Sequence, residues 1–283
     1  MTPSSPTAVC VIDDIQLPKL VTGNALGPDK AFGWAGYVVP LDGMRRLLKH
    51  LDSAKKAAGL DPDDPVKRFP DDALRKVYHR IHGRTEGNKR FQVAKQNALA
   101  IGDQVIPKLE SVGASAVACT VWPYSSTPTQ EMTLSWAFES LVQRVGLESQ
   151  SHAWSDVLVV IDRPPNKPDA LNESYRLGLH HGQASDGTEY YCGALRERGF
   201  FGGLLISATP YSPALQVADY VAGACRDFLL WCWTKKDKAR ARRTFGPLWP
   251  AMRKYHGRID RAGLLIDPNP GFTVDGKIAR LMN

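Results

Sequence analysis

Three aspartates of this chain lie beside apolar residues, where an unpaired carboxylate is costly. Asp13 ends the apolar run 9–12 and is followed by Asp14, and Asp162 ends the apolar run 157–161. Each run predicts a buried strand with an acidic residue at its carboxyl end. Open α/β sheets place their ligands at that end of their strands.

The third aspartate, Asp219, falls in a segment that predicts a helix. Ser212 suits the N-cap position and Pro213 the first helical position, after a predicted buried strand and a short turn. Asp219 then lies almost two turns into the helix, one turn after Leu215. A metal ion is one partner that would offset the cost of a carboxylate on this face.

Carboxylates from two strands and a helix, far apart in sequence, can converge on one point. Oxygen ligands of this kind suit Mg²⁺ or Mn²⁺. Hydrolysis of a phosphodiester by two such ions needs carboxylates that hold them roughly 3.5–4 Å apart. We therefore expect a divalent metal site built by Asp13, Asp162 and Asp219, with their side chains within about 4–8 Å of each other.

In these motifs the chain resembles a bacterial and phage family of unknown function that is related to RNase H-like nucleases. The resemblance covers residues 8 to 232 and is most specific at Leu215-Gln216-Val217-Ala218-Asp219. It implies an RNase H-like mixed sheet flanked by helices, in which Asp13 bridges two metal ions. Asp14 stands where the family usually has Glu, and Ile15 where it usually has Ser.

Further residues qualify for roles around the aspartates. The family takes a fourth carboxylate from the helix before the middle strand, which points to Glu139. Glu139 could instead face solvent, and Asp14 would then be the fourth ligand. Lys67, after the first long helix, matches a lysine that could hold a phosphate or simply lie on the surface. Gln216, one turn before Asp219, is a candidate donor that orients it.

Basic residues are clustered, and the net charge of the chain is +7. One basic stretch runs from residue 67 to 95 and includes Arg68. Such clustering is the electrostatic signature of a polyanion binder, although an isolated charge run is also typical of a solvated face. Beside an acidic metal site it favours nucleic acid as the partner. The densest group comprises Lys235, Lys236, Lys238, Arg240, Arg242 and Arg243.

Apolar strands alternate with amphipathic helices, which predicts an α/β fold. We expect residues 1–233 to form the RNase H-like domain and residues 234–283 to be a basic C-terminal extension packed on it. The predicted strands are 8–16, 31–39, 115–122, 156–161 and 200–207. The predicted helices are 43–58, 71–82, 89–111 with a break near Pro107, 129–145, 168–182 and 213–233.

Several function classes lack support in the sequence. No apolar run is long enough for a membrane span, and the N-terminus has no basic and apolar signal-peptide pattern. The five cysteines form no CxxC pair, as expected for reduced thiols of a cytoplasmic protein. No G-x-S-x-G motif supports serine hydrolase chemistry.

Two functions fit these features best. One is a metal-dependent nuclease that cuts phosphodiester bonds through the aspartates. The other is a nucleic-acid-binding protein that retains the fold without catalysis, which the departure at Asp14 favours. A structural protein of a phage or mobile element is a third possibility. Uptake of Mg²⁺ or Mn²⁺ distinguishes the first from the second.

Overall fold

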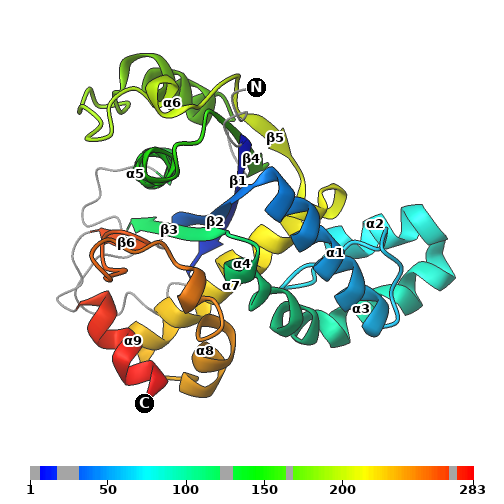
Figure 1. Cartoon of the computed structure of the whole chain (residues 1–283). Coiled ribbons are helices and arrows are strands. Elements are labelled where there is room, and N and C mark those ends of the chain that lie inside the picture. Colours follow the sequence, from blue (N-terminus) through cyan, green and yellow to red (C-terminus); the bar gives the residue numbers. More distant parts are fainter. Residues whose placement is uncertain (1–6, 18–31, 122–129, 164–167, 268–272) are drawn as a thin grey trace.

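The computed structural model describes residues 7–17, 32–121, 130–163, 168–267 and 273–283. They form an α/β fold around a six-stranded mixed sheet with helices on both faces (Figure 1). In spatial order the strands are β5 (Leu205–Ser207), β4 (Asp156–Asp162), β1 (Thr7–Gln16), β2 (Phe32–Pro40), β3 (Ser115–Val121) and β6 (Leu264–Asp267).

Most strands run in the same direction, so most of their carboxyl ends lie at the same end of the sheet. β1 runs parallel to β4 and antiparallel to β2, and β2 is antiparallel to β3. β5 and β6 extend the two edges in parallel with their neighbours. The central strands are apolar on both sides because helices cover both faces. This mixed topology is compatible with an RNase H-like fold.

Helices divide between the two faces (Figure 1). On one face, Val11 and Tyr37 belong to a core shared with α1, α3 and α7; on the other, Cys10 and Trp34 pack with α5 and α6. The helices are α1 (Leu41–Ala57), α2 (Asp72–His82), α3 (Arg84–Val105), α4 (Lys108–Ser111), α5 (Gln130–His152), α6 (Pro168–His181), α7 (Pro213–Thr234), α8 (Lys238–Phe245) and α9 (Val274–Met282).

Most predicted elements are confirmed, with ends shifted by a few residues; Trp122 and Thr129 lie outside the described residues. The predicted strand 200–207 is wrong in length and burial, because β5 is a short edge strand whose Leu205 is 48% exposed. The predicted helix 89–111 starts too late, since α3 begins at Arg84, two residues after α2 ends. Pro107 separates α3 from α4 as predicted.

Residues after α7 add a strand to the sheet and a helix that packs on α7. β6 pairs with β3, and α8 packs on α7 through the stacked rings of Phe228 and Phe245, whose centroids lie 4.2 Å apart. All five cysteines are buried and free. Thus the C-terminal fifty residues contribute a strand to the same sheet as the aspartates.

Close packing of β1 against β2 leads to a stability prediction. A Cβ atom at Gly36 would lie 1.9 Å from the carbonyl oxygen of Val11, which belongs to the backbone and cannot turn away. We expect Gly36→Ala to lower the free energy of unfolding by about 3 kcal/mol or more, the upper range for overpacking. Urea denaturation measures the change.

Gly203 provides the control for this substitution. A Cβ atom there meets nothing within 4 Å, so Gly203→Ala should change stability by less than about 0.5 kcal/mol. Equal stability of the two variants would contradict the close approach of β1 and β2 at Gly36.

Candidate metal centre

Two of the predicted aspartates lie on neighbouring parallel strands: Asp162 ends β4, whereas β1 continues past Asp13 to Gln16. Ile12 of β1 pairs with Ile161 of β4, so Asp13 and Asp162 follow side by side at the same edge of the sheet. One carboxylate oxygen from each of Asp13, Asp14 and Asp162 lies within 4.8 Å of the other two. Among the described residues, these three side chains form a group whose oxygens are close enough together to bind one metal ion.

Backbone amides hold these carboxylates in place. Asp13 accepts a hydrogen bond from the Asp14 N–H at 2.8 Å, and Asp162 accepts one from the Thr209 N–H at 2.8 Å. The Thr209 hydroxyl also lies 3.4 Å from Asp13 Oδ2. Thr209 comes two residues after the end of β5, so this short edge strand positions a residue that contacts both aspartates.

Asp219 approaches the centre from α7. The Ser212 side chain caps this helix as predicted, and the half-buried Asp219 carboxylate accepts a hydrogen bond from the Arg68 N–H. Asp219 and Asp14 both line a cavity of about 410 Å³. The small residues Ala222 and Gly223, one turn further along α7, line the same cavity. Asp219 therefore borders the centre through this cavity, while Asp14 completes the close group.

Burial and nearby negative charges make Asp13, Asp162 and Asp219 hard to ionise. Burial, and then Asp219, Asp162 and Asp14, raise the pKa of Asp13 well above its usual value. Burial also raises the pKa of Asp162, against hydrogen bonds from Thr209. The pKa of Asp219 rises to about 6, chiefly through burial. Such a group of like charges is stabilised by a cation.

Lys67 supplies one positive charge to the centre. Burial disfavours its ammonium, but Asp219, Asp71 and Asp13 outweigh burial and raise the pKa of Lys67. Its Nζ lies 3.4 Å from Asp71, and both residues line the cavity with Asp219. The Lys67 side chain is 21% exposed, so it forms part of the cavity wall and is not a freely solvated surface lysine.

Glu139 does not join the aspartates. It is buried on α5, which covers the opposite face of the sheet, and it accepts a hydrogen bond from the Ser185 N–H at 2.8 Å. Burial raises its pKa. Both expectations for Glu139, a fourth ligand and a solvent-facing residue, are therefore wrong: it holds the loop after α6. Among the described residues, no hydrogen bond joins Gln216 to Asp219, and the buried Gln216 Oε1 has no partner.

Sequence reasoning missed an aromatic residue in the cavity wall. Phe69 is 38% exposed and lines the cavity together with Arg226. The Arg226 guanidinium lies 4.5 Å from the centre of the Phe69 ring, and that of Arg240 lies 5.5 Å from it. The signal was present in the sequence, because Phe69 directly follows Lys67 and Arg68 in a basic stretch.

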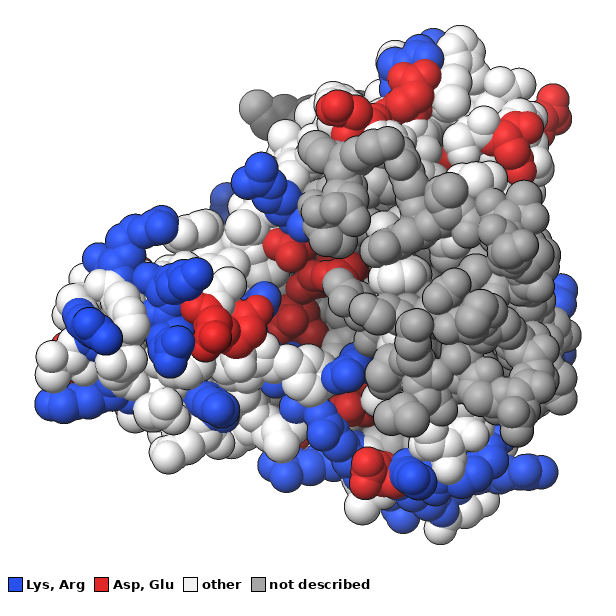
Figure 2. All heavy atoms as spheres, turned by 180° about the vertical axis from the view of Figure 1, so that it is seen from behind, with Lys and Arg blue, Asp and Glu red and all other residues white. Residues whose placement is uncertain are grey.

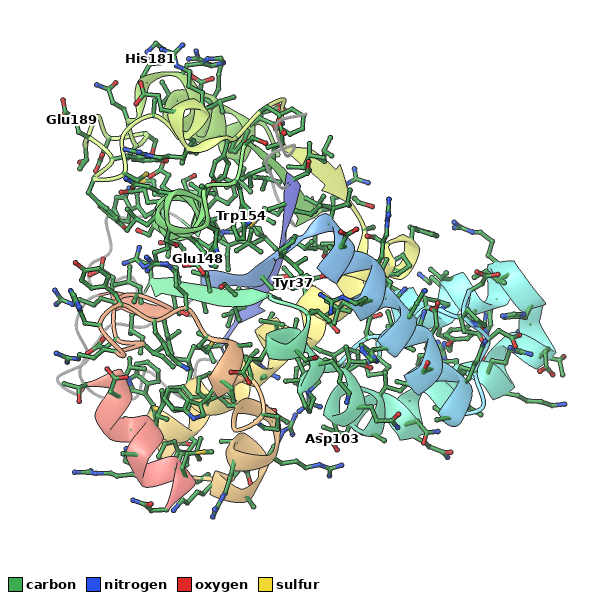
Figure 3. All side chains as sticks on the ribbon, viewed as in Figure 1. Tyr37, Asp103, Glu148, Trp154, His181 and Glu189 are labelled. Carbon is green, nitrogen blue, oxygen red and sulfur yellow. The ribbon has the colours of Figure 1, made fainter. Side chains whose placement is uncertain are left out.

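Several arginines expected on a basic surface have carboxylate partners. Arg68 is buried and paired with Asp227, so it is not part of a polyanion-binding surface. Arg240 also contacts Asp227, at 3.0 Å. Arg243 pairs with Asp103, which α3 presents toward α8 (Figure 3).

Lys235 donates to the carbonyl of Cys232 at the end of α7. Within the described chain, the exposed residues of the group that bind neither a carboxylate nor a backbone carbonyl through the side chain are Lys236, Lys238 and Arg242.

Charge is distributed unevenly over the face of the molecule that Figure 2 shows. Figure 2 shows acidic side chains gathered near the middle of this face. Lys and Arg side chains lie over the α2–α3 region on one side and along the lower edge, where α8 and α9 lie. A polyanion crossing the acidic centre would meet positive charge on either side of it.

Comparisons with protein-family models, with curated proteins and with solved structures found no match to this chain. Among the helices of the described residues, none has both the length and the apolar character needed to cross a membrane.

The raised pKa of Asp219 predicts how stability changes with pH. In the metal-free protein, the folded state keeps a proton on Asp219 up to about pH 6, whereas an ordinary aspartate has a pKa of 3.8. The folded state therefore binds more protons between these values, and its stability falls as the pH rises through them. A difference of about two pKa units corresponds to about 3 kcal/mol.

We expect Asp219→Asn to reduce this loss of stability between about pH 4 and 7, measured by urea unfolding in EDTA. Asp42→Asn, at a 90% exposed side chain, is the control and should follow the wild type. Identical pH profiles of wild type and Asp219→Asn would contradict a raised pKa of Asp219 in the folded state.

The unpaired cations of the basic group give a separate prediction. If they contact phosphates, replacing Lys236, Lys238 and Arg242 by Gln should lower the slope of log affinity against log salt by up to about 0.9 per contact on duplex DNA. Fluorescence anisotropy at several salt concentrations measures it. A matched triple of exposed residues, Lys76, Arg84 and Lys95, tests the other basic stretch, and an unchanged slope in the first triple would exclude α8 from the interface.

Proposed function

We propose that this protein is a divalent-metal-dependent nuclease with an RNase H-like fold. The observation that carries the proposal is the convergence of Asp13, Asp14 and Asp162 beside a cavity that also contains Lys67. The proposal includes membership of the bacterial and phage family that the sequence motifs resemble. It also places the protein in the cytoplasm, where thiols such as its five free cysteines stay reduced.

The donor set suits Mg²⁺ or Mn²⁺. Carboxylate oxygens are the ligands these ions prefer, and the three aspartates offer them within 4.8 Å of one another. Asp13, Asp14 and Asp162 would hold the metal, with Asp219 at the border of the same cavity. A bound divalent ion would supply a nucleophilic hydroxide at neutral pH and neutralise charge on the phosphate.

Side chains that line the cavity beside Asp219 would bind the substrate. Lys67 places its ammonium beside Asp219, where a phosphate oxygen near the metal site can accept a hydrogen bond. Phe69 offers an exposed ring on which a nucleobase can stack. The Arg226 guanidinium lies against this ring, in a position to neutralise a neighbouring phosphate.

The geometry favours the nuclease over a binding protein without catalysis. The change from Glu to Asp at residue 14 raised doubt about the second carboxylate of the first strand. In the structure, the shorter Asp14 side chain still brings an oxygen within 4.8 Å of Asp13 and Asp162. The substitution has therefore not removed a carboxylate from the centre.

Cleavage assays test the proposal directly. With Mg²⁺ or Mn²⁺, we expect the protein to cut at least one substrate from a panel of single-stranded DNA, duplex DNA, RNA and RNA–DNA hybrid. Asp162→Asn keeps the shape of the side chain but removes a charged ligand, so it should lower the cleavage rate by about 100-fold or more, as loss of a main catalytic group does.

Asp42→Asn serves as the control and should cut at the wild-type rate, because that carboxylate is exposed on α1. Metal-dependent binding of nucleic acid with no cleavage of any substrate would identify a binding protein instead. Equal cleavage by wild type and Asp162→Asn would place the activity outside the aspartate centre.

A further inference from the structure

A second and larger cavity lies away from the aspartates. It has a volume of about 820 Å³ and is formed by α5, the loop before η2 (Leu195–Arg198) and the turns that precede β6. α5 packs on the face of the sheet opposite to the one that α7 and Asp13 occupy. This volume is within the range of pockets that hold small organic ligands.

Two buried arginines line this cavity. Arg144 and Arg253 are each only 7% exposed. Arg144 donates through Nε to the carbonyl of Arg261 at 2.9 Å, and Arg253 donates through Nε to Glu148 at 3.0 Å and through Nη1 to the carbonyl of Ala262. Figure 3 shows Glu148 on the side of α5 that faces β3.

Each of these guanidinium groups has donors to spare. Within the described chain, neither Nη2 of Arg144 nor Nη2 of Arg253 makes a hydrogen bond to protein. Arg144 and Arg261 also have no carboxylate partner among the described residues, whereas Arg253 is paired with Glu148. Buried positive charge without a counter-charge is costly unless an anion binds.

Aromatic rings stand at the mouth of the cavity. Tyr191 is 60% exposed and Tyr255 is 65% exposed, and both line it. Tyr255 begins a tight turn in which it exchanges two backbone hydrogen bonds with Arg258, while His256 and Gly257 take the left-handed conformation. Asp275 of α9 accepts hydrogen bonds from the N–H groups of Ile259 and Asp260, and these bonds hold the residues after the turn in place.

From this arrangement we infer that the cavity binds a nucleoside phosphate. Guanidinium groups match the geometry of phosphate oxygens, and the spare donors of Arg144 and Arg253 would bind them. The rings of Tyr191 and Tyr255 offer faces for stacking with the base. This binding is separate from the proposed nuclease activity, because the cavity shares no lining residue with the one beside Asp219.

Calorimetry without metal tests this inference on the full chain. In EDTA, ADP and UDP are titrated separately, and pyrophosphate serves as the probe without a nucleoside. We expect one-to-one binding of at least one nucleotide and binding of pyrophosphate that is about tenfold weaker or less. Arg144→Gln and Tyr255→Ala should each weaken nucleotide binding about tenfold.

A control tests whether the loss of any surface cation weakens binding. Arg46→Met removes an exposed cation on α1 that lines neither cavity, and it should leave nucleotide binding unchanged. Because Arg144 also supports the carbonyl of Arg261, Arg261→Asn provides a second variant: Asn tolerates the left-handed φ of 59° at this position and removes only the outer charge. It should also weaken binding.

Three results would overturn the inference. They are failure of both nucleotides to bind at millimolar concentration, binding that is unchanged in Arg261→Asn and Tyr255→Ala, and pyrophosphate binding as tight as that of the nucleotides. None of these results depends on cleavage, so the nuclease proposal stands or fails separately.

Discussion

Repulsion among one buried and two half-buried carboxylates is the interaction around which this structure is arranged. Two unit charges about 4 Å apart repel by about 4 kcal/mol at the effective dielectric of a protein surface, and Asp13, Asp14 and Asp162 bring oxygens to comparable distances. Backbone amides of Asp14 and Thr209 offset part of this cost, and Lys67 offsets more. In the metal-free protein, burial and then the repulsion from neighbouring carboxylates raise the pKa of Asp13. A divalent cation removes the same repulsion at neutral pH.

The surroundings of the centre depend on one buried ion pair. The Arg68 backbone N–H binds Asp219, and its guanidinium reaches Asp227 two turns further along α7. These two contacts hold the chain around Arg68 against α7. Its neighbours Lys67 and Phe69 therefore line the cavity. Both members of the pair are almost fully buried, and removing one partner from such a pair typically costs 3–5 kcal/mol. The acidic centre and the cationic wall are therefore parts of one packed unit.

Apolar runs and helix caps in the sequence predicted the elements that hold the aspartates, because strand burial and N-capping are local properties. Long-range pairing was not predictable in the same way. The sequence did not indicate that Asp227 would pair with both Arg68 and Arg240, so the basic surface was overestimated. Glu139 had a plausible spacing, but its helix packs on the other face of the sheet. The cavity beside Arg144 depends on contacts between α5 and the last forty residues, which no local pattern records.

The central claim is that the three aspartates hold a divalent cation. Anomalous diffraction from a crystal soaked in Mn²⁺ measures this most directly, because it locates the ion without requiring activity. We expect a peak bound by carboxylate oxygens of Asp13, Asp14 and Asp162, on the side of the cavity that Asp219 borders. No peak at this position, with Mn²⁺ bound elsewhere or not at all, would contradict the account.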